Sequence, residues 1–171
     1  MIAASQPAPG ATVASSGCPH ANAQPGAAST SELRHATLCL INRARTSAGL
    51  QPLALNGDLT QMAKHHTKVM LAQDCLKHQC DGEGALASRL KASGYLDGAT
   101  KWWYAEDLGY ESTPKRMVNR WLNTTLDEHH LLSDSYVDVG IGPGAGSAEA
   151  GIEDSSFASY TIDLAERKPV K

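Results

Sequence analysis

The apolar residues in the first half of the chain are spaced as in amphipathic helices. Ser29 and Glu32 form a capping-box pattern ahead of apolar residues three to four apart, and Gly49 is a typical stop. Asn56 predicts the cap of a second helix, whose apolar stripe includes His66. The pattern therefore predicts two long helices, with His66 as a hydrogen-bonded core histidine rather than a ligand.

The second half changes to short helices and alternating strands. Residues 85–93 predict a short helix, and the Thr-Pro pair at 113–114 opens another. The aromatic segment 102–110 has β-favouring residues, and its two tryptophans are expected to pack on the sheet rather than form a ligand platform. Strands at 136–142 and 156–165, joined by a Gly/Ala-rich turn, predict a hairpin. Helices followed by mixed helices and antiparallel strands indicate an α+β class.

Composition and charge indicate the domain organisation and narrow the possible classes of function. Residues 1–28 are rich in Ala, Pro, Gly and Ser and predict an extended or disordered arm, tethered by Cys18, ahead of one domain at 29–171. The net charge of −3, without a basic run, gives no reason to expect nucleic-acid binding. No stretch reaches the length of a membrane span, and the opening residues lack the pattern of a signal peptide.

The four cysteines carry information about the compartment. Cys75 and Cys80 bound a very short loop, and the paired CxxC spacing typical of structural zinc is missing. Disulfides Cys18–Cys39 and Cys75–Cys80 are the preferred interpretation, with free buried thiols as the alternative. Disulfides would place the protein outside the reducing cytosol.

Several short motifs in order carry a family resemblance over about residues 32–165. An N-x-x-R pair, Asn42 and Arg45, precedes a G-L-x-P-L link, and further motifs follow in the same order as in bacterial CAP domains. The chain thus resembles the CAP superfamily (cysteine-rich secretory, antigen 5 and pathogenesis-related-1 proteins). The later motifs are His78, Arg89, Gly94-Tyr95, the segment AEDL at 105–108, Trp121 and the two terminal strands.

The resemblance implies a secreted, bacterial-type protein with a three-layer α-β-α sandwich, a mostly antiparallel central sheet and a His/Glu cleft. His78 matches the first cleft histidine, and Glu106 matches the glutamate of the Gly-Glu-Asn motif. Asp107 stands where the family has Asn. Asp127 stands six residues after Trp121, where the family has its second histidine. The ligand cleft is therefore expected to comprise His78, Glu106, Asp107 and Asp127.

These side chains suggest two kinds of function. His78, with one of Asp127, His129 or His130, can be expected to hold zinc or another divalent metal with an open position for water. Glu106 is a candidate acid or base. The favoured hypothesis is a monomeric extracellular binding module for a lipid, a cell-wall component or a protein. The alternatives are a metal-assisted hydrolase of peptides or cell-wall polymers, and a structural domain whose cleft is a remnant.

Overall fold

The computed structural model describes residues 12–169, and within them the predicted helices begin where their caps indicate. Ser29 and Glu32 form a complete capping box, and the side chain of Asn56 accepts hydrogen bonds at the start of the second helix. The elements in this part of the chain are α1 (Thr30–Ser47), β1 (Ala54–Leu55), α2 (Gly57–Gln73), α3 (Leu86–Ala92), β2 (Ala99–Glu111), α4 (Pro114–Leu122), α5 (Thr125–Leu131), β3 (Asp138–Ala145) and β4 (Ala158–Pro169).

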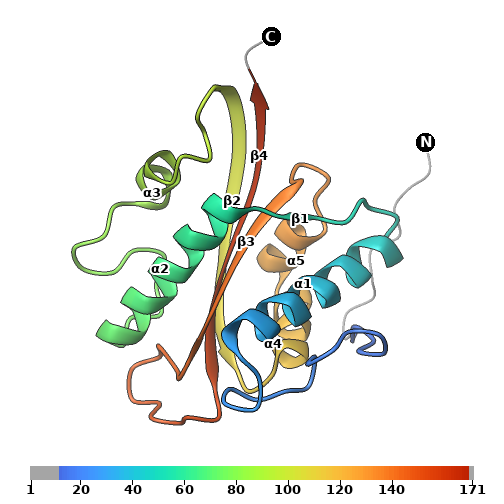
Figure 1. The fold of residues 1–171 in the computed structure, drawn as a ribbon, viewed down its shortest axis with the longest axis vertical. Helices are drawn as coiled ribbons and strands as arrows, with labels where there is room; N and C mark the ends of the chain where they lie inside the picture. The colour runs from blue at the N-terminus through green and yellow to red at the C-terminus, as the bar shows by residue number, and fades with distance from the viewer. Residues whose placement is uncertain (1–11, 170–171) are drawn as a thin grey trace.

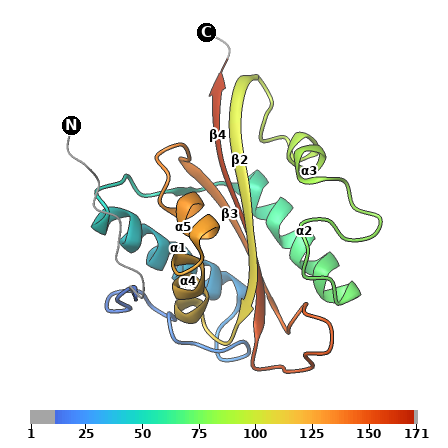
Figure 2. The same cartoon turned by 180° about the vertical axis from the view of Figure 1, so that it is seen from behind.

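The strands form one sheet in the order β1-β3-β4-β2. β4 pairs antiparallel with both β3 and β2, while the two-residue β1 pairs parallel with β3. Helices α2 and α3 cover one face, and α1, α4 and α5 cover the other (Figure 1). The same layers seen from behind place β2 at an edge of the sheet (Figure 2). The expected α+β sandwich with a mostly antiparallel sheet is confirmed.

The larger apolar core lies between the sheet and α1, α4 and α5. Tyr160, Ile162 and Leu164 of β4 alternate toward this side and are fully buried. Trp121 of α4 meets Tyr160 edge-on at 6.2 Å between ring centroids, and its indole nitrogen donates to the carbonyl of Leu108. The period-two pattern in the sequence therefore identifies the core face of β4.

Helix α2 packs unusually close to the opposite face. A Cβ at Gly140 would lie 2.1 Å from the carbonyl carbon of Leu59, and one at Gly142 would lie 2.4 Å from that of Ala63. The hydroxyl of Thr67 donates to the carbonyl of Gly142 at 2.6 Å. Alternate glycines on β3 therefore let the helix backbone rest directly on the strand, which brings the buried face of α2 close to the sheet.

The N-x-x-R pair ties the loops to α1. The amide of Asn42 exchanges two hydrogen bonds with the backbone of Leu53. Arg45 is buried and donates to the carbonyls of Leu131 and Ser133 at 2.7 and 2.8 Å. The arginine thereby holds the end of α5 against the body, so this pair is structural and positions the helix that carries Asp127.

The N-terminal arm joins the body through the Cys18–Cys39 disulfide, which confirms this predicted pairing. The carbonyl of Ala21 accepts a hydrogen bond from the backbone of Lys115 at the start of α4. The rest of the predicted arm, residues 1–11, lies outside the described residues. None of the helices in the described part of the chain has the length and apolar character needed to span a membrane.

Candidate functional site

Glu106 is the centre of a polar cluster beneath α2 and α3. Its side chain has no exposed area, although β2 is an edge strand. Nδ1 of His78 donates to Oε1 at 2.9 Å, and Nη2 of Arg89 donates to Oε2 at 2.9 Å. Nε2 of His66 lies 3.9 Å from Oε1. Three cationic or proton-donating side chains thus surround one buried carboxylate.

These contacts shift the pKa values of Glu106 and His78 in opposite directions. Burial by itself would raise the pKa of Glu106, but His78, Arg89 and His66 outweigh it and hold that pKa below its usual value. The hydrogen bond to Glu106 raises the pKa of His78 against the opposing effect of burial. Glu106 is therefore a carboxylate with both oxygens engaged, which suits holding His78 better than acting as a free base.

His66 forms a second layer behind Glu106. Its Nδ1 lies 2.8 Å from a carboxyl oxygen of Glu83, and its Nε2 lies 3.0 Å from the carbonyl oxygen of Lys77. A carbonyl can only accept, so Nε2 carries a hydrogen, and a further proton must lie between Nδ1 and Glu83. The His66–Glu83 pair is therefore neutral overall, and it anchors the loop that leads to His78. The prediction of a hydrogen-bonded core histidine describes His66 correctly.

The loop that presents His78 is closed by the Cys75–Cys80 disulfide, and this confirms the second predicted pairing. The backbone nitrogen of Cys80 donates to Glu83, and Nη2 of Arg89 donates to the carbonyl of His78 at 2.8 Å. The loop is thus fastened at the disulfide, at Glu83 and at Arg89. An imidazole whose side chain is 65% exposed is therefore held in one orientation.

A buried acid lies next to Glu106 on the neighbouring strand. Asp163 is the register partner of Glu106 and is 1% exposed. Burial, followed by the charge of Glu106, raises the pKa of Asp163 well above its usual value, which favours the protonated acid. The cluster therefore places two acidic side chains side by side, and their surroundings shift the two pKa values in opposite directions.

Asp107 belongs to the opposite face of β2, because successive side chains on a strand alternate. Its Oδ1 lies 2.7 Å from Nδ1 of His130 on α5. Asp127 precedes His130 by three residues, so both face β2 from one side of the helix. Burial, then the charge and hydrogen bond of Asp127, raise the pKa of Asp107 to about 9. Burial also lowers the pKa of His130. Asp107 therefore holds a proton, which its Oδ1 can donate to Nδ1 of His130.

The site consequently spans the free edge of β2, with Glu106 on one face and Asp107 on the other. His78 and Asp127 still interact electrostatically across this edge. Of the two neighbouring histidines of α5, His130 meets Asp107 whereas His129 is exposed. The four expected cleft residues thus gather around one strand but form two clusters.

Sequence reasoning missed three members of the site. Arg89 was noted only as a family motif, and neither Asp163 nor the contact of His66 with Glu106 was expected. The available signal was polarity on a buried strand: Ser159, Thr161 and Asp163 alternate with the large apolar residues of β4 and are all buried. A polar face under a helix indicates a hydrogen-bonded network rather than an apolar core.

The donor set fits a resident metal ion poorly. Within residues 12–169, no group of three or more His, Cys, Asp or Glu side chains is arranged to hold one. Arg89 contacts both oxygens of Glu106, and a guanidinium there opposes a second cation by charge. The zinc site with His78 and one of Asp127, His129 or His130 therefore stays a prediction, as does metal-assisted hydrolysis.

Comparison with known proteins agrees with this fold. The sequence profile described as the cysteine-rich secretory protein family, CAP, matches residues 38–148. The chain therefore belongs to the CAP family. No curated protein matches the sequence closely enough to add a function.

Three solved structures of bacterial proteins have this fold. An extracellular protein with an SCP domain from Bacillus anthracis has a TM-score of 0.64 at 21% identity, over 78% of this chain and 40% of that one. An outer surface protein from Borrelia burgdorferi has a TM-score of 0.68 at 18% identity, over 82% of this chain and 97% of that one. A cysteine-rich secretory protein from Staphylococcus aureus has a TM-score of 0.56 at 17% identity, over 80% of this chain and 39% of that one. The chain spans about two fifths of the Bacillus and Staphylococcus proteins, and the likeness concerns the fold.

Proposed function

We propose that the chain is a secreted recognition module that binds a polar, hydroxyl-rich component of the cell wall at the edge of β2. The observation that carries this proposal is the fixed and exposed ring of His78. Glu106 and the disulfide loop orient this imidazole, and no described residue is hydrogen-bonded to its Nε2. A polar group that is exposed yet held in place loses little conformational freedom when a ligand binds.

The surrounding charges favour a neutral ligand. Asp127 supplies a half-exposed carboxyl group that can accept hydrogen bonds, and His78 supplies a donor on the other side of the same strand edge. An anionic ligand would meet Asp127 and the buried charge of Glu106. Sugar hydroxyls both donate and accept, so they can satisfy His78 and Asp127 together. Two disulfides and the extracellular character of the similar structures support secretion.

The test is binding of soluble, uncharged cell-wall sugar fragments (oligomers of N-acetylglucosamine), measured by calorimetry and by chemical shifts of the histidine rings. We expect His78→Ala to weaken binding at least about tenfold, because a hydrogen bond to a charged group is lost. His65→Ala is the matched control, since His65 is exposed on α2 away from the cluster. Equal affinity of both variants, or no binding by the wild type, would refute the proposal. Cleavage of the fragments during titration would instead support the hydrolase hypothesis.

A further inference from the structure

One end of the sheet projects as a two-stranded ribbon. β3 begins at Asp138, whose register partner on β4 is Ala165, so the last residues of β4 pair only with β2. Figures 1 and 2 both show the ends of β2 and β4 extending past β3 and the helices. The ribbon comprises residues 99–104 of β2 and 165–169 of β4. Ala165 at the base of the ribbon is buried against α2 and α3, whereas residues 100–104 of β2 are all exposed.

The exposed aromatic residues of the described chain are all in this ribbon. Trp102, Trp103 and Tyr104 have 38%, 44% and 38% of their surface exposed, whereas every other described Trp, Tyr or Phe is buried or half-buried. The expectation that both tryptophans pack on the sheet is therefore wrong for much of their surface. Because side chains alternate along a strand, Trp102 and Tyr104 occupy one face and Trp103 the other. Val137, 45% exposed, lies beside the ribbon.

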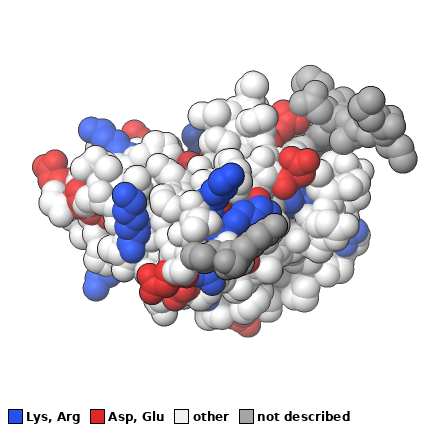
Figure 3. Space-filling model, turned by 90° about the horizontal axis from the view of Figure 1, so that it is seen from above, with Lys and Arg blue, Asp and Glu red and all other residues white. Residues whose placement is uncertain are grey.

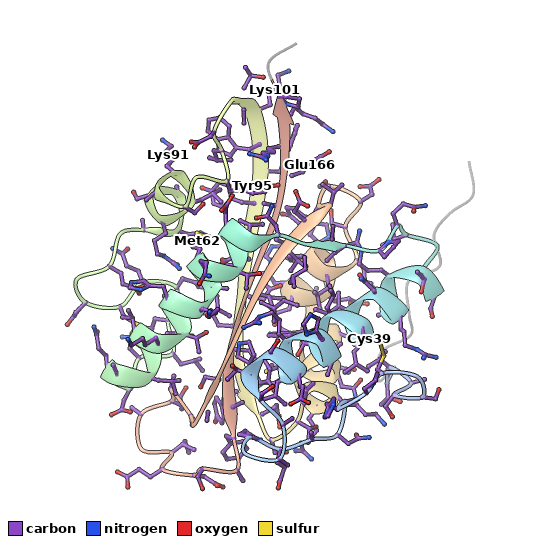
Figure 4. All side chains as sticks on the ribbon, in the orientation of Figure 1. Cys39, Met62, Lys91, Tyr95, Lys101 and Glu166 are labelled. Atoms are coloured by element: carbon purple, nitrogen blue, oxygen red, sulfur yellow. A yellow bond between two sulfur atoms is a disulfide. The ribbon has the colours of Figure 1, made fainter. Side chains whose placement is uncertain are left out.

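Basic side chains accompany these rings. Lys101 and Lys168 are register partners, an arrangement that places two like charges directly opposite each other. Lys168 is ion-paired with Glu166, while no described acidic side chain is paired with Lys101. Figure 4 shows Lys101 and Glu166 at the projecting end, and Figure 3, which looks onto that end, shows blue side chains near its centre. Lys101 is therefore the ribbon lysine whose charge an external anion can compensate.

We propose that this ribbon docks on the surface of an anionic phospholipid bilayer. Trp and Tyr rings favour the boundary between hydrocarbon and water because each has an apolar body and a polar edge. Lys101 and Lys168 would contact lipid phosphates, and Trp102 and Trp103 would enter the headgroup region from the two faces of the ribbon. The proposal rests on the side chains of the ribbon alone, so it does not depend on the function proposed at His78.

The edge of the ribbon argues against a second copy of the chain as the occupant. The register of β2 with β4 shifts between Ala99 and Lys101, and such irregularities interrupt the regular edge that strand addition requires. A lysine at an edge also opposes pairing with an identical strand. A bilayer is therefore a better partner for these aromatic rings than the sheet of a second copy of the chain.

Sedimentation with phosphatidylcholine vesicles, with and without phosphatidylglycerol, tests the proposal on the full chain. We expect binding to the anionic vesicles and a blue shift of tryptophan fluorescence, with quenching by brominated lipids. Trp102→Ala/Trp103→Ala should abolish sedimentation, and Lys101→Gln should lower the partition coefficient about fivefold, the factor for one cation near an anionic surface. Ile152→Ala and Lys64→Gln are matched controls, because both residues are exposed outside the ribbon.

Three results would overturn the proposal. The first is that the wild type does not sediment with anionic vesicles. The second is that the tryptophan variant sediments as the wild type does. The third is that the control variants lose as much binding as the ribbon variants. Quenching by brominated lipids on the unmodified protein decides the matter if a variant misfolds. Should ultracentrifugation instead show a dimer that the tryptophan variant dissociates, without vesicle binding, the occupant is a second copy and the bilayer proposal is wrong.

Discussion

Replacing Arg89 by Met tests the charge arrangement at Glu106. The side chain of Arg89 is 8% exposed and that of Glu106 is 0% exposed, so this ion pair is shielded from water. Removing one partner of a buried pair typically destabilises a protein by about 3–5 kcal/mol, because the remaining charge is left uncompensated. His78, which donates to Glu106 at 2.9 Å, is still present in the variant and compensates part of the charge. We therefore expect a loss of unfolding free energy at the lower end of this range, about 3 kcal/mol.

The pH dependence distinguishes a lost charge from lost packing. In the wild type the pKa of Glu106 is lowered, so its contribution to stability is present above its ordinary pKa and disappears as pH falls through the lowered value. Without Arg89, burial should raise the pKa of Glu106, and the variant can take up a proton on acidification. The difference in unfolding free energy should therefore be largest at neutral pH and shrink toward about pH 4.

Urea denaturation of both proteins at the two pH values gives this difference. Lys91→Met is the control, since Lys91 is an exposed residue of the same helix and should change stability by less than about 0.5 kcal/mol. Adding Glu106→Gln to the arginine variant should recover part of the loss, because the unpaired charge is removed. A loss below about 1 kcal/mol that is the same at both pH values would show that Arg89 does not stabilise a buried charge.

Three further predictions concern the scaffold and the second cluster. Gly140→Ala places a Cβ 2.1 Å from the backbone of α2, so it should lower the unfolding free energy by about 3 kcal/mol or more, whereas Gly57→Ala, with open space, should change it little. Asp107→Asn should stabilise the protein by an amount that grows between about pH 4 and 9. The raised pKa of Asp107 makes the wild type lose stability as pH rises in this range, whereas Asn does not titrate. Parallel thermal melts of the wild type and the variant check this. Removing the Cys18–Cys39 disulfide by double Ser substitution should cost about 3 kcal/mol, and an unchanged melting temperature would contradict a stabilising role.

Local features of this chain were readable without the fold. The caps at Ser29, Asn56 and Thr113 depend on hydrogen bonds within one turn, so the residues themselves specify where α1, α2 and α4 begin. Period-two alternation identified the core face of β4, and cysteine spacing led to both disulfides. The two-residue β1 was not predicted, because it exists only through its pairing with β3. The short helix α5 was not predicted either.

The site shows where sequence reasoning stops. The sequence by itself determined that His78 and Glu106 belong to one region, because the family motifs place them, and that Asp107 and Asp127 depart from the family pattern. Only the tertiary structure decided that Glu106 pairs with Arg89 and lies beside Asp163 on one face of β2 while Asp107 meets His130 on the other. Strand register and the close approach of α2 determine these contacts, and both depend on residues far apart in the chain, such as Gly140 and Leu59.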